Sequence, residues 1–327
     1  MTDLSTTYMG INIKNPVIVS SSQLTGTLEG IKKCEAAGAG AVVAKSLFEE
    51  QILHNIEDLE NDETVFTHPE AFEYIHQMGM QLGPDDYLSL IEQAKKETNI
   101  PVIASLNCVS AGWWVEYAEK LENAGADALE LNISILPQSI DTTSRKIEEQ
   151  YLTIVNKVTK KTDLPIAVKI GNYFTSLPHF TEELRKAGAS AIVIFNRFYR
   201  LDIDIDNLDF IHGQRFSSST DLQPLLRWTG LLYGQIGCDI SCTTGVHTGE
   251  DAVKLLLTGA KTIQVCSALY QNSLSTIQKI TERLSQWMEE KKFTSVKEFT
   301  GLMSKSGTKT PEVYNRLQYI KALTGLE

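Results

Sequence analysis

The stretch from Cys238 to Leu269 has the sequence CDISCTTGVHTGEDAVKLLLTGAKTIQVCSAL. It predicts a β-strand that ends in Thr243-Thr244-Gly245, a helix from Gly249 to Leu257, and a second strand, 262–265, that ends in Cys266-Ser267. Small, glycine-bearing turns at strand ends let backbone N–H groups approach an anion closely. In a (β/α)8 barrel, the loops after the seventh and eighth strands form the usual phosphate site. The alternative interpretation is two ordinary tight turns in an α/β protein.

The rest of the chain repeats this alternation of strands and helices. Apolar, β-rich runs separated by helical patterns indicate a parallel sheet with crossover helices. Six further strands are predicted at Pro16–Ser20, Ala41–Lys45, Pro101–Ser105, Asp127–Ile133, Leu164–Ile170 and Ala191–Phe195. Eight strands in this arrangement predict a (β/α)8 TIM barrel. A doubly wound sheet is the rival, but no G-x-G-x-x-G motif follows the first strand.

Domain organisation and location follow from length and composition. The 327 residues contain no linker and no low-complexity tract, so we expect a single domain, 1–327, with a long loop insertion at about 46–80 and a long irregular insertion at about 196–221. The net charge of −11 argues against nucleic-acid and anionic-membrane partners. We expect no membrane span, since no apolar run reaches about 18 residues. The five widely spread cysteines suggest reduced thiols in a cytoplasmic protein.

Polar side chains end the predicted strands, where a barrel places its active site. Lys45 and Lys169 each end an apolar run, and a buried ammonium must meet an anion, a carbonyl or a polar ligand. The alternative is that these lysines pair with a strand-end carboxylate such as Glu130. Two lysines, two asparagines and several hydroxyls on one face suit a polar, aromatic, phosphorylated cofactor, and flavin mononucleotide (FMN) fits. The strand-end residues are Ser20, Ser21, Ser22, Lys45, Ser46, Ser105, Asn107, Asn132, Ser134, Lys169, Asn196, Ser241, Thr243, Thr244, Gly245, Gln264, Cys266 and Ser267.

Several motifs in order resemble those of the dihydroorotate dehydrogenase family, especially its soluble class 1 enzymes. They are NPVIVSSS (15–22), AVVAKS (41–46), MGMQLGPDDYL (78–88), PVIASLN (101–107), GADALELNIS (125–134), LPIAVKI (164–170) and the stretch from Thr243 to Leu269. The likeness covers nearly the whole chain. It implies a TIM barrel, an FMN cofactor, a small-molecule substrate and a homodimer.

The resemblance also implies roles for individual residues. Ser20 and Ser21 would lie against the flavin, and Lys169 would bond the flavin ring near N1. Lys45, Ser46 and Asn132 would contact both the flavin and the substrate. The turns Thr244-Gly245 and Cys266-Ser267 would hold the phosphate. The remaining substrate contacts would be His76, Met78, Gly79 and Asn196.

The chain departs from the family pattern mainly on the substrate side. Ile135 stands where the family has a Cys or Ser base, and Gln138 follows Pro137 where the family has Asn. An isoleucine cannot take a proton, so another group must act as the base. The candidates for this base are His76, Ser134 and Cys108, and Lys45 is also predicted to be catalytic. A solvated loop histidine and a buried small residue are the alternative interpretations of His76 and Cys108.

Further departures surround the substrate and phosphate sites. Asn196 is followed by Arg197, which is a candidate clamp for a carboxylate substrate or else a member of a surface ion pair. Thr-Thr-Gly replaces Gly-Gly at the seventh strand, and Cys266 replaces a phosphate-loop glycine. We therefore expect an FMN-dependent oxidoreductase that takes hydride from a small cyclic amide or carboxylate. The alternatives are a genuine dihydroorotate dehydrogenase with a displaced base and a non-catalytic barrel that binds FMN or a phosphorylated metabolite.

Overall fold

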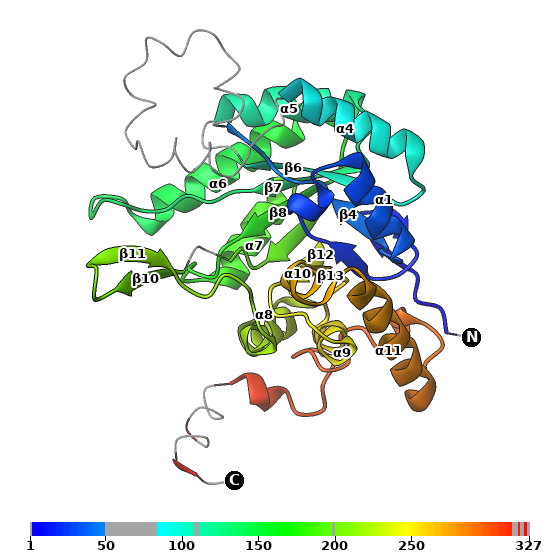
Figure 1. The fold of residues 1–327 in the computed structure, drawn as a ribbon. Helices are drawn as coiled ribbons and strands as arrows, with labels where there is room; N and C mark the ends of the chain where they lie inside the picture. The colour runs from blue at the N-terminus through cyan, green and yellow to red at the C-terminus, as the bar shows by residue number, and fades with distance from the viewer. Residues whose placement is uncertain are drawn as a thin grey trace, which may run out of the picture.

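Eight parallel strands close into a barrel that helices surround (Figure 1). The computed structural model describes residues 2–49, 84–107, 111–197 and 200–315, together with 320, 324 and 325. The barrel strands are β3 (Val17–Val19), β4 (Ala41–Val43), β6 (Val102–Asn107), β7 (Ala128–Asn132), β8 (Ile166–Ile170), β9 (Ala191–Ile194), β12 (Asp239–Thr243) and β13 (Thr262–Val265). Strand β13 pairs with β3 and closes the ring. The predicted (β/α)8 barrel is confirmed.

A helix follows each barrel strand and covers its outer face. These helices are α1 (Leu28–Ala36), α4 (Pro84–Glu97), α5 (Ala111–Asn123), α6 (Ser144–Thr159), α7 (Leu177–Lys186), α8 (Gln223–Leu232), α9 (Gly249–Thr258) and α11 (Ser275–Lys291). Helix α9 shows how local sequence sets the bounds. Thr248 and Asp251 form a capping box at its start, and Gly259, with φ 115°, ends it in the left-handed conformation. None of the described helices is long and apolar enough to cross a membrane.

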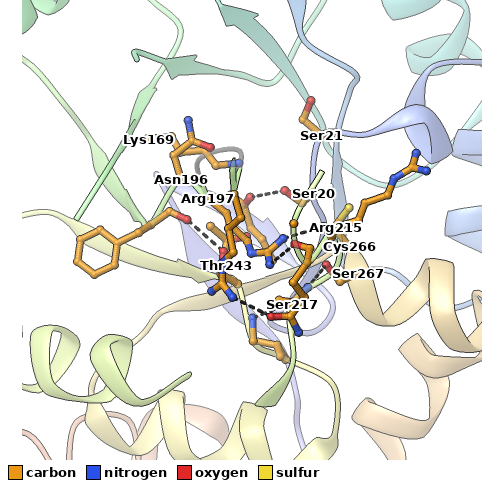
Figure 2. A pocket seen from close by; sticks show the side chains of 18 of the residues that line it. Ser20, Ser21, Lys169, Asn196, Arg197, Arg215, Ser217, Thr243, Cys266 and Ser267 are labelled. Carbon is orange, nitrogen blue, oxygen red and sulfur yellow. Dashed lines mark hydrogen bonds between the residues drawn. The ribbon is translucent and has the colours of Figure 1, made fainter. Parts of the chain in front are cut away.

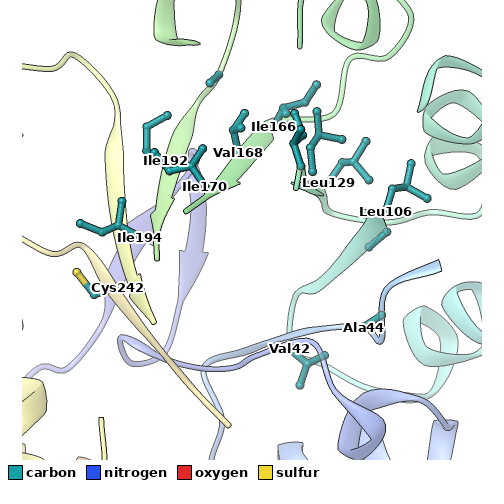
Figure 3. Close-up of a cluster of buried hydrophobic side chains, with 14 of the residues drawn as sticks. Val42, Ala44, Leu106, Leu129, Ile166, Val168, Ile170, Ile192, Ile194 and Cys242 are labelled. Carbon is teal, nitrogen blue, oxygen red and sulfur yellow. The ribbon is translucent and has the colours of Figure 1, made fainter. Parts of the chain in front are cut away.

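Alternating side chains of each strand fill two separate cores. The outward-facing residues, such as Val42, Leu129 and Ile192, pack beneath the helices (Figure 3). The inward-facing residues Ile18, Val43, Ile103 and Val193 are buried inside the barrel together with Tyr8, Met9 and Ile13. The last three come from a hairpin of β1 (Thr6–Tyr8) and β2 (Ile11–Ile13). Because this hairpin packs on the N-terminal half of the barrel interior, the polar residues occupy the C-terminal half.

The insertion at 196–221 differs from the irregular segment that we expected. It contains an antiparallel hairpin of β10 (Leu201–Asp204) and β11 (Asp209–His212), which projects from the barrel in Figure 1. The sequence LDIDIDNLDF alternates apolar and acidic residues, which is the period of a strand. The apolar positions stay exposed, so the hairpin does not resemble a core strand. Most of the predicted insertion at about 46–80 lies outside the described residues; its first part includes β5 (Leu47–Phe48), which pairs with the end of β6.

Candidate active site

A cavity of about 800 Å³ opens at the C-terminal ends of the barrel strands (Figure 2). Lys169 and Asn196 lie at one end of it, and Ser217 and Ser267 lie toward the other. Its lining includes these residues predicted from the sequence: Ser20, Ser21, Lys169, Asn196, Arg197, Thr244, Gly245, Cys266 and Ser267. Arg200 and Arg215 line it as well, and among the described lining residues there is no carboxylate. The cavity therefore favours an anionic ligand.

A buried polar network forms the floor of this cavity. Lys169 Nζ on β8 lies 3.6 Å from Glu130 Oε1 on β7, and the two side chains are 9% and 1% exposed. The other oxygen, Oε2, accepts a 2.7 Å hydrogen bond from Gln264 Nε2, and Gln264 Oε1 accepts one of 3.1 Å from Ser20 Oγ. Lys169 thus has its charge balanced by Glu130 while part of its ammonium faces the cavity. Its remaining N–H donors are available to a ligand.

The second predicted lysine has a different environment. Lys45 lies two residues before β5 and is half-buried, and this burial lowers the pKa of its ammonium group. No carboxylate of the described chain lies within ion-pair distance of Lys45. Pairing with Glu130, the alternative that we considered for both lysines, therefore applies to Lys169 alone.

Two asparagines that are 64 positions apart meet above the cavity floor. Asn196 Nδ2 donates a 2.8 Å hydrogen bond to Asn132 Oδ1. Asn132 ends β7, and the backbone N–H of Asn196 donates to the carbonyl of Ile170 at the end of β8. The barrel thus brings together two side chains that we predicted to contact substrate.

Three serines at neighbouring strand ends form a hydrogen-bonded row. Ser46 Oγ lies 3.0 Å from Ser21 Oγ and 2.7 Å from Ser105 Oγ. The hydroxyl of Tyr87 accepts a 2.8 Å bond from the backbone N–H of Ser105 and donates to its carbonyl at 3.1 Å. Ser21 lines the cavity, and Ser46 positions it from behind.

The predicted phosphate turns lie side by side, and Ser217 joins them. The backbone N–H of Gly245 donates to Ser217 Oγ at 3.3 Å, and that of Ser217 donates to Ser267 Oγ at 3.1 Å. Ser217 Oγ also lies 3.1 Å from His247 Nε2. Gly245 has φ +85°, and a Cβ on it would lie 2.7 Å from the backbone nitrogen of Leu222, so glycine is required. Our sequence reasoning missed Ser217, whose Ser-rich surroundings give no distinctive signal.

Cys266 does not need to be a glycine in this fold. Its φ of −143° is negative, so its backbone does not adopt the left-handed conformation that favours glycine. Burial raises the pKa of the Cys266 thiol, so the thiol is neutral at pH 7. The side chain lines the cavity as a small, uncharged group. Thr244, with φ 81°, adopts the left-handed conformation, and its hydroxyl donates to the carbonyl of Phe195.

Arg197 has main-chain partners in this structure. Its guanidinium group donates to the carbonyl oxygens of Gln214, Arg215 and Phe216 at 2.7, 2.7 and 3.1 Å. Burial lowers the pKa of Arg197. Within the described part of the chain it forms no ion pair, so the surface ion-pair interpretation finds no support there. Its role as a clamp for a carboxylate substrate stays a prediction.

The position of the family base is apolar. Ile135 is half-buried and packs against the core beneath the helices. Its backbone N–H points to the hydroxyl of Tyr151, which itself donates a 2.9 Å bond to the carbonyl of Ile133. The neighbouring Ser134 is half-buried, and its hydroxyl has no hydrogen-bond partner among the described residues. The predictions for His76, Met78, Gly79 and Cys108 fall outside the described residues.

The residues of the cavity fit FMN. Lys169, Asn196 and the serines supply donors for the polar edge of a flavin, and the joined turns at Gly245 and Ser267 supply small, polar groups for a phosphate. The cationic lining matches the charge of that phosphate. Together, a (β/α)8 barrel and a cationic cavity at its strand ends suit an enzyme that binds a phosphorylated cofactor.

The comparisons with known proteins identify the family. The family model for dihydroorotate dehydrogenase matches residues 3–288, and the chain belongs to this family. Its members bind FMN and are flavin-dependent oxidoreductases that act on CH–CH groups.

The relatives cover almost the full chain. The protein is 30% identical over 308 residues to "Dihydroorotate dehydrogenase B (NAD(+)), catalytic subunit" of Pyrococcus abyssi, a match that spans 92% of this chain and 99% of that protein. It is also 30% identical to the protein of the same name from Pyrococcus furiosus, over 90% of this chain and 97% of that one. A third relative, "Putative dihydroorotate dehydrogenase A (fumarate)" of Aeropyrum pernix, is 26% identical over 91% of this chain and 97% of its own length.

Proposed function

We propose that this protein transfers a hydride from a small cyclic amide or carboxylate substrate to FMN. The observation that carries the proposal is the placement of Lys169 at the cavity floor, balanced by Glu130 and beside a cavity large enough for a flavin. When bound, FMN supplies the hydride acceptor. A cation at the floor stabilises negative charge that develops on the flavin ring, which is the electrostatic help that hydride transfer needs.

The other cavity residues have proposed roles in binding. Ser20 and Ser21 lie against the flavin, and the turns at Thr244-Gly245 and Cys266-Ser267 hold its phosphate. Lys45, Ser46 and Asn132 contact the flavin ring. Substrate binding is assigned to Lys45 and to the hydrogen-bonded pair Asn132 and Asn196. The further substrate contacts that we propose are His76, Met78, Gly79 and Arg197.

The base that removes the substrate proton is not Ile135, because an aliphatic side chain cannot accept a proton. Among the described residues, Lys45 and Ser134 are the predicted catalytic residues whose side chains can accept a proton. The lowered pKa of Lys45 increases its neutral, basic fraction. Ser134 adjoins Ile135, and its hydroxyl is unengaged within the described chain. His76 and Cys108 stay candidates from the sequence.

Dihydroorotate itself is the second candidate substrate. The relatives' names support it, since the Pyrococcus abyssi protein is named a dihydroorotate dehydrogenase and the Aeropyrum pernix protein a putative one, and both match nearly the full chain. The replacement of the family base by Ile135 argues for a different substrate. The two names give NAD(+) and fumarate, so the electron acceptor of this protein needs its own measurement. A homodimer in the cytoplasm, which the resemblance and the cysteine usage suggest, belongs to the same proposal.

An absorbance spectrum of purified protein, followed by anaerobic addition of dihydroorotate, tests the proposal. A yellow protein that bleaches supports dihydroorotate as substrate and requires a base other than residue 135. A yellow protein that bleaches only with another cyclic amide or carboxylate supports the first proposal. If no member of such a panel reduces the flavin, the non-catalytic alternative is favoured. A colourless protein that rejects added FMN overturns the cofactor site.

A further inference from the structure

The loop 213–217 runs along the phosphate end of the cavity and carries a cation there. Gly213, Gln214, Arg215 and Ser217 all line the cavity. Ser217 is the residue that joins Gly245 to Ser267, and Arg215 lies two positions before it in the same loop. Figure 2 shows Arg215 on the same side of the cavity as Cys266 and Ser267.

Two other arginines fix this loop in place. Arg197 donates to three consecutive carbonyl oxygens of the loop, those of residues 214 to 216. Arg200 donates to Gln214 Oε1 at 2.7 Å and also pairs with Asp221. Nη1 and Nη2 of Arg197 and the guanidinium group of Arg200 therefore bond to the protein itself and hold residues 213–217 against the barrel, while the buried Nε of Arg197 has no hydrogen-bond partner among the described residues.

Arg215 differs from these two arginines because its guanidinium is not occupied in this way. No carboxylate in the described part of the chain lies within ion-pair distance of it. Its side chain is exposed and lies over the ring of Phe216, at 5.7 Å from the centroid. The described lining of the cavity offers no anion to neutralise Arg215, so a ligand phosphate would be its first strong partner there.

Two nearby backbone donors already have acceptors. The N–H of Gly245 donates to Ser217 Oγ and that of Ser217 to Ser267 Oγ. A phosphate at this end therefore benefits from a donor beyond the main chain. A guanidinium group supplies two parallel N–H donors and a fixed positive charge, a geometry that matches phosphate. We infer that Arg215 binds the 5′-phosphate of the cofactor and makes this barrel select FMN over the unphosphorylated flavin; the inference rests on the proposed FMN site.

A comparison of FMN with riboflavin tests this inference, since the two ligands differ only by the phosphate. The affinities of wild-type protein and Arg215→Gln for each ligand are measured by quenching of flavin fluorescence. We expect Arg215→Gln to weaken FMN binding by about ten- to a hundredfold, as for loss of a charge-assisted hydrogen bond, and to change riboflavin binding by less than about twofold. Arg227→Gln is the matched control. It removes the same charge from an exposed position on α8 that does not line the cavity, and both affinities should stay at the wild-type level.

Two results would overturn the inference. One is an unchanged FMN affinity in Arg215→Gln, and the other is an equal loss for FMN and riboflavin, which would mean that Arg215 only supports the shape of the cavity. A measurement on wild-type protein covers the case of a variant that does not fold: added salt should weaken FMN binding and leave riboflavin binding unchanged, and equal salt dependence would refute the inference.

These outcomes are separable from those of the proposed function. A protein that shows the Arg215-dependent preference for FMN but reduces its flavin with no substrate retains the inference and loses the proposed activity. Conversely, wild-type protein that oxidises a substrate, together with Arg215→Gln that binds FMN as tightly as wild type, is the opposite outcome. That outcome supports the proposed activity and refutes the inference about Arg215.

Discussion

Lys169 on β8 and Glu130 on β7 form an ion pair at the floor of the cavity, with Nζ 3.6 Å from Oε1 and both side chains nearly excluded from solvent. Removing either side chain would leave the other charge buried without a counter-charge. Glu130 is further fixed by Gln264, so the carboxylate holds its position while the ammonium group faces the cavity. This pairing connects the stability of the barrel to the chemistry of its site.

Replacing Glu130 by Ala should destabilise the protein by about 3 kcal/mol, because it leaves the ammonium of Lys169 buried without a counter-charge. Chemical denaturation of the FMN-free wild-type and variant proteins measures this difference in unfolding free energy. Glu149→Ala is the control, since Glu149 pairs with Arg145 on the surface of α6 and its loss should cost less than about 1 kcal/mol. Losses of similar size for the two variants would contradict a structural role for the buried pair.

Lys169→Met should slow flavin reduction by about a hundred- to a thousandfold, because it removes the cation that stabilises charge on the flavin ring. The rate constant is obtained by anaerobic stopped-flow absorbance with whichever substrate bleaches the wild-type protein, on variant loaded with FMN. Lys157→Met, at an exposed position near the end of α6, is the control and should keep the wild-type rate. An unchanged rate constant in Lys169→Met would remove this lysine from the proposed chemistry.

Ile135→Cys should increase the rate of flavin reduction by dihydroorotate, by about a hundredfold or more, because it places an ionisable thiol where the family has its base. Anaerobic bleaching of the flavin reports the rate. Leu136→Cys offers a matched control, because residue 136 is adjacent and its side chain is 64% exposed. The prediction fails if the flavin of both cysteine variants is reduced at the wild-type rate, or if the rate of flavin reduction rises equally in both.

The stability of the protein should fall in alkali in a way that depends on Cys34. Burial raises the pKa of this thiol to about 11, whereas an unfolded cysteine titrates near pH 8.5. The pKa of the thiol is higher in the folded state than in the unfolded state. The contribution of the protonated thiol to the free energy of unfolding is therefore fully present below about pH 8.5 and is lost as the pH rises towards about 11.

Cys34→Ala isolates this contribution. The variant should be less stable than wild type at pH 7 because of lost packing. The difference in unfolding free energy between wild type and variant should shrink by about 2 kcal/mol by pH 10.5. Unfolding free energies at the two pH values provide the measurement. A gap of constant size would show that the Cys34 thiol does not titrate differently in the folded and unfolded states.

Much of the fold could be predicted from the sequence because it depends on local patterns. The apolar runs and their helical partners gave all eight barrel strands, and the rule that active sites lie at strand ends placed Ser20, Lys169, Asn196 and Gly245 around one cavity. The hairpin at 201–212 was missed, although its alternation of apolar and acidic residues is local, because its apolar side chains remain exposed and it does not belong to the barrel.

Only the tertiary structure decided which of these residues are partners. Closure of the ring between β13 and β3 lets Gln264 join Ser20 to Glu130, and so fixes which lysine is balanced by that carboxylate. In the same way, Arg197 donates to loop carbonyls, whereas Arg215 has no carboxylate partner in the described chain. The sequence by itself determined the strands and their polar ends, since periodicity and residue type act over a few residues. Pairing between side chains depends on distances set by the closed barrel, which links positions far apart along the chain.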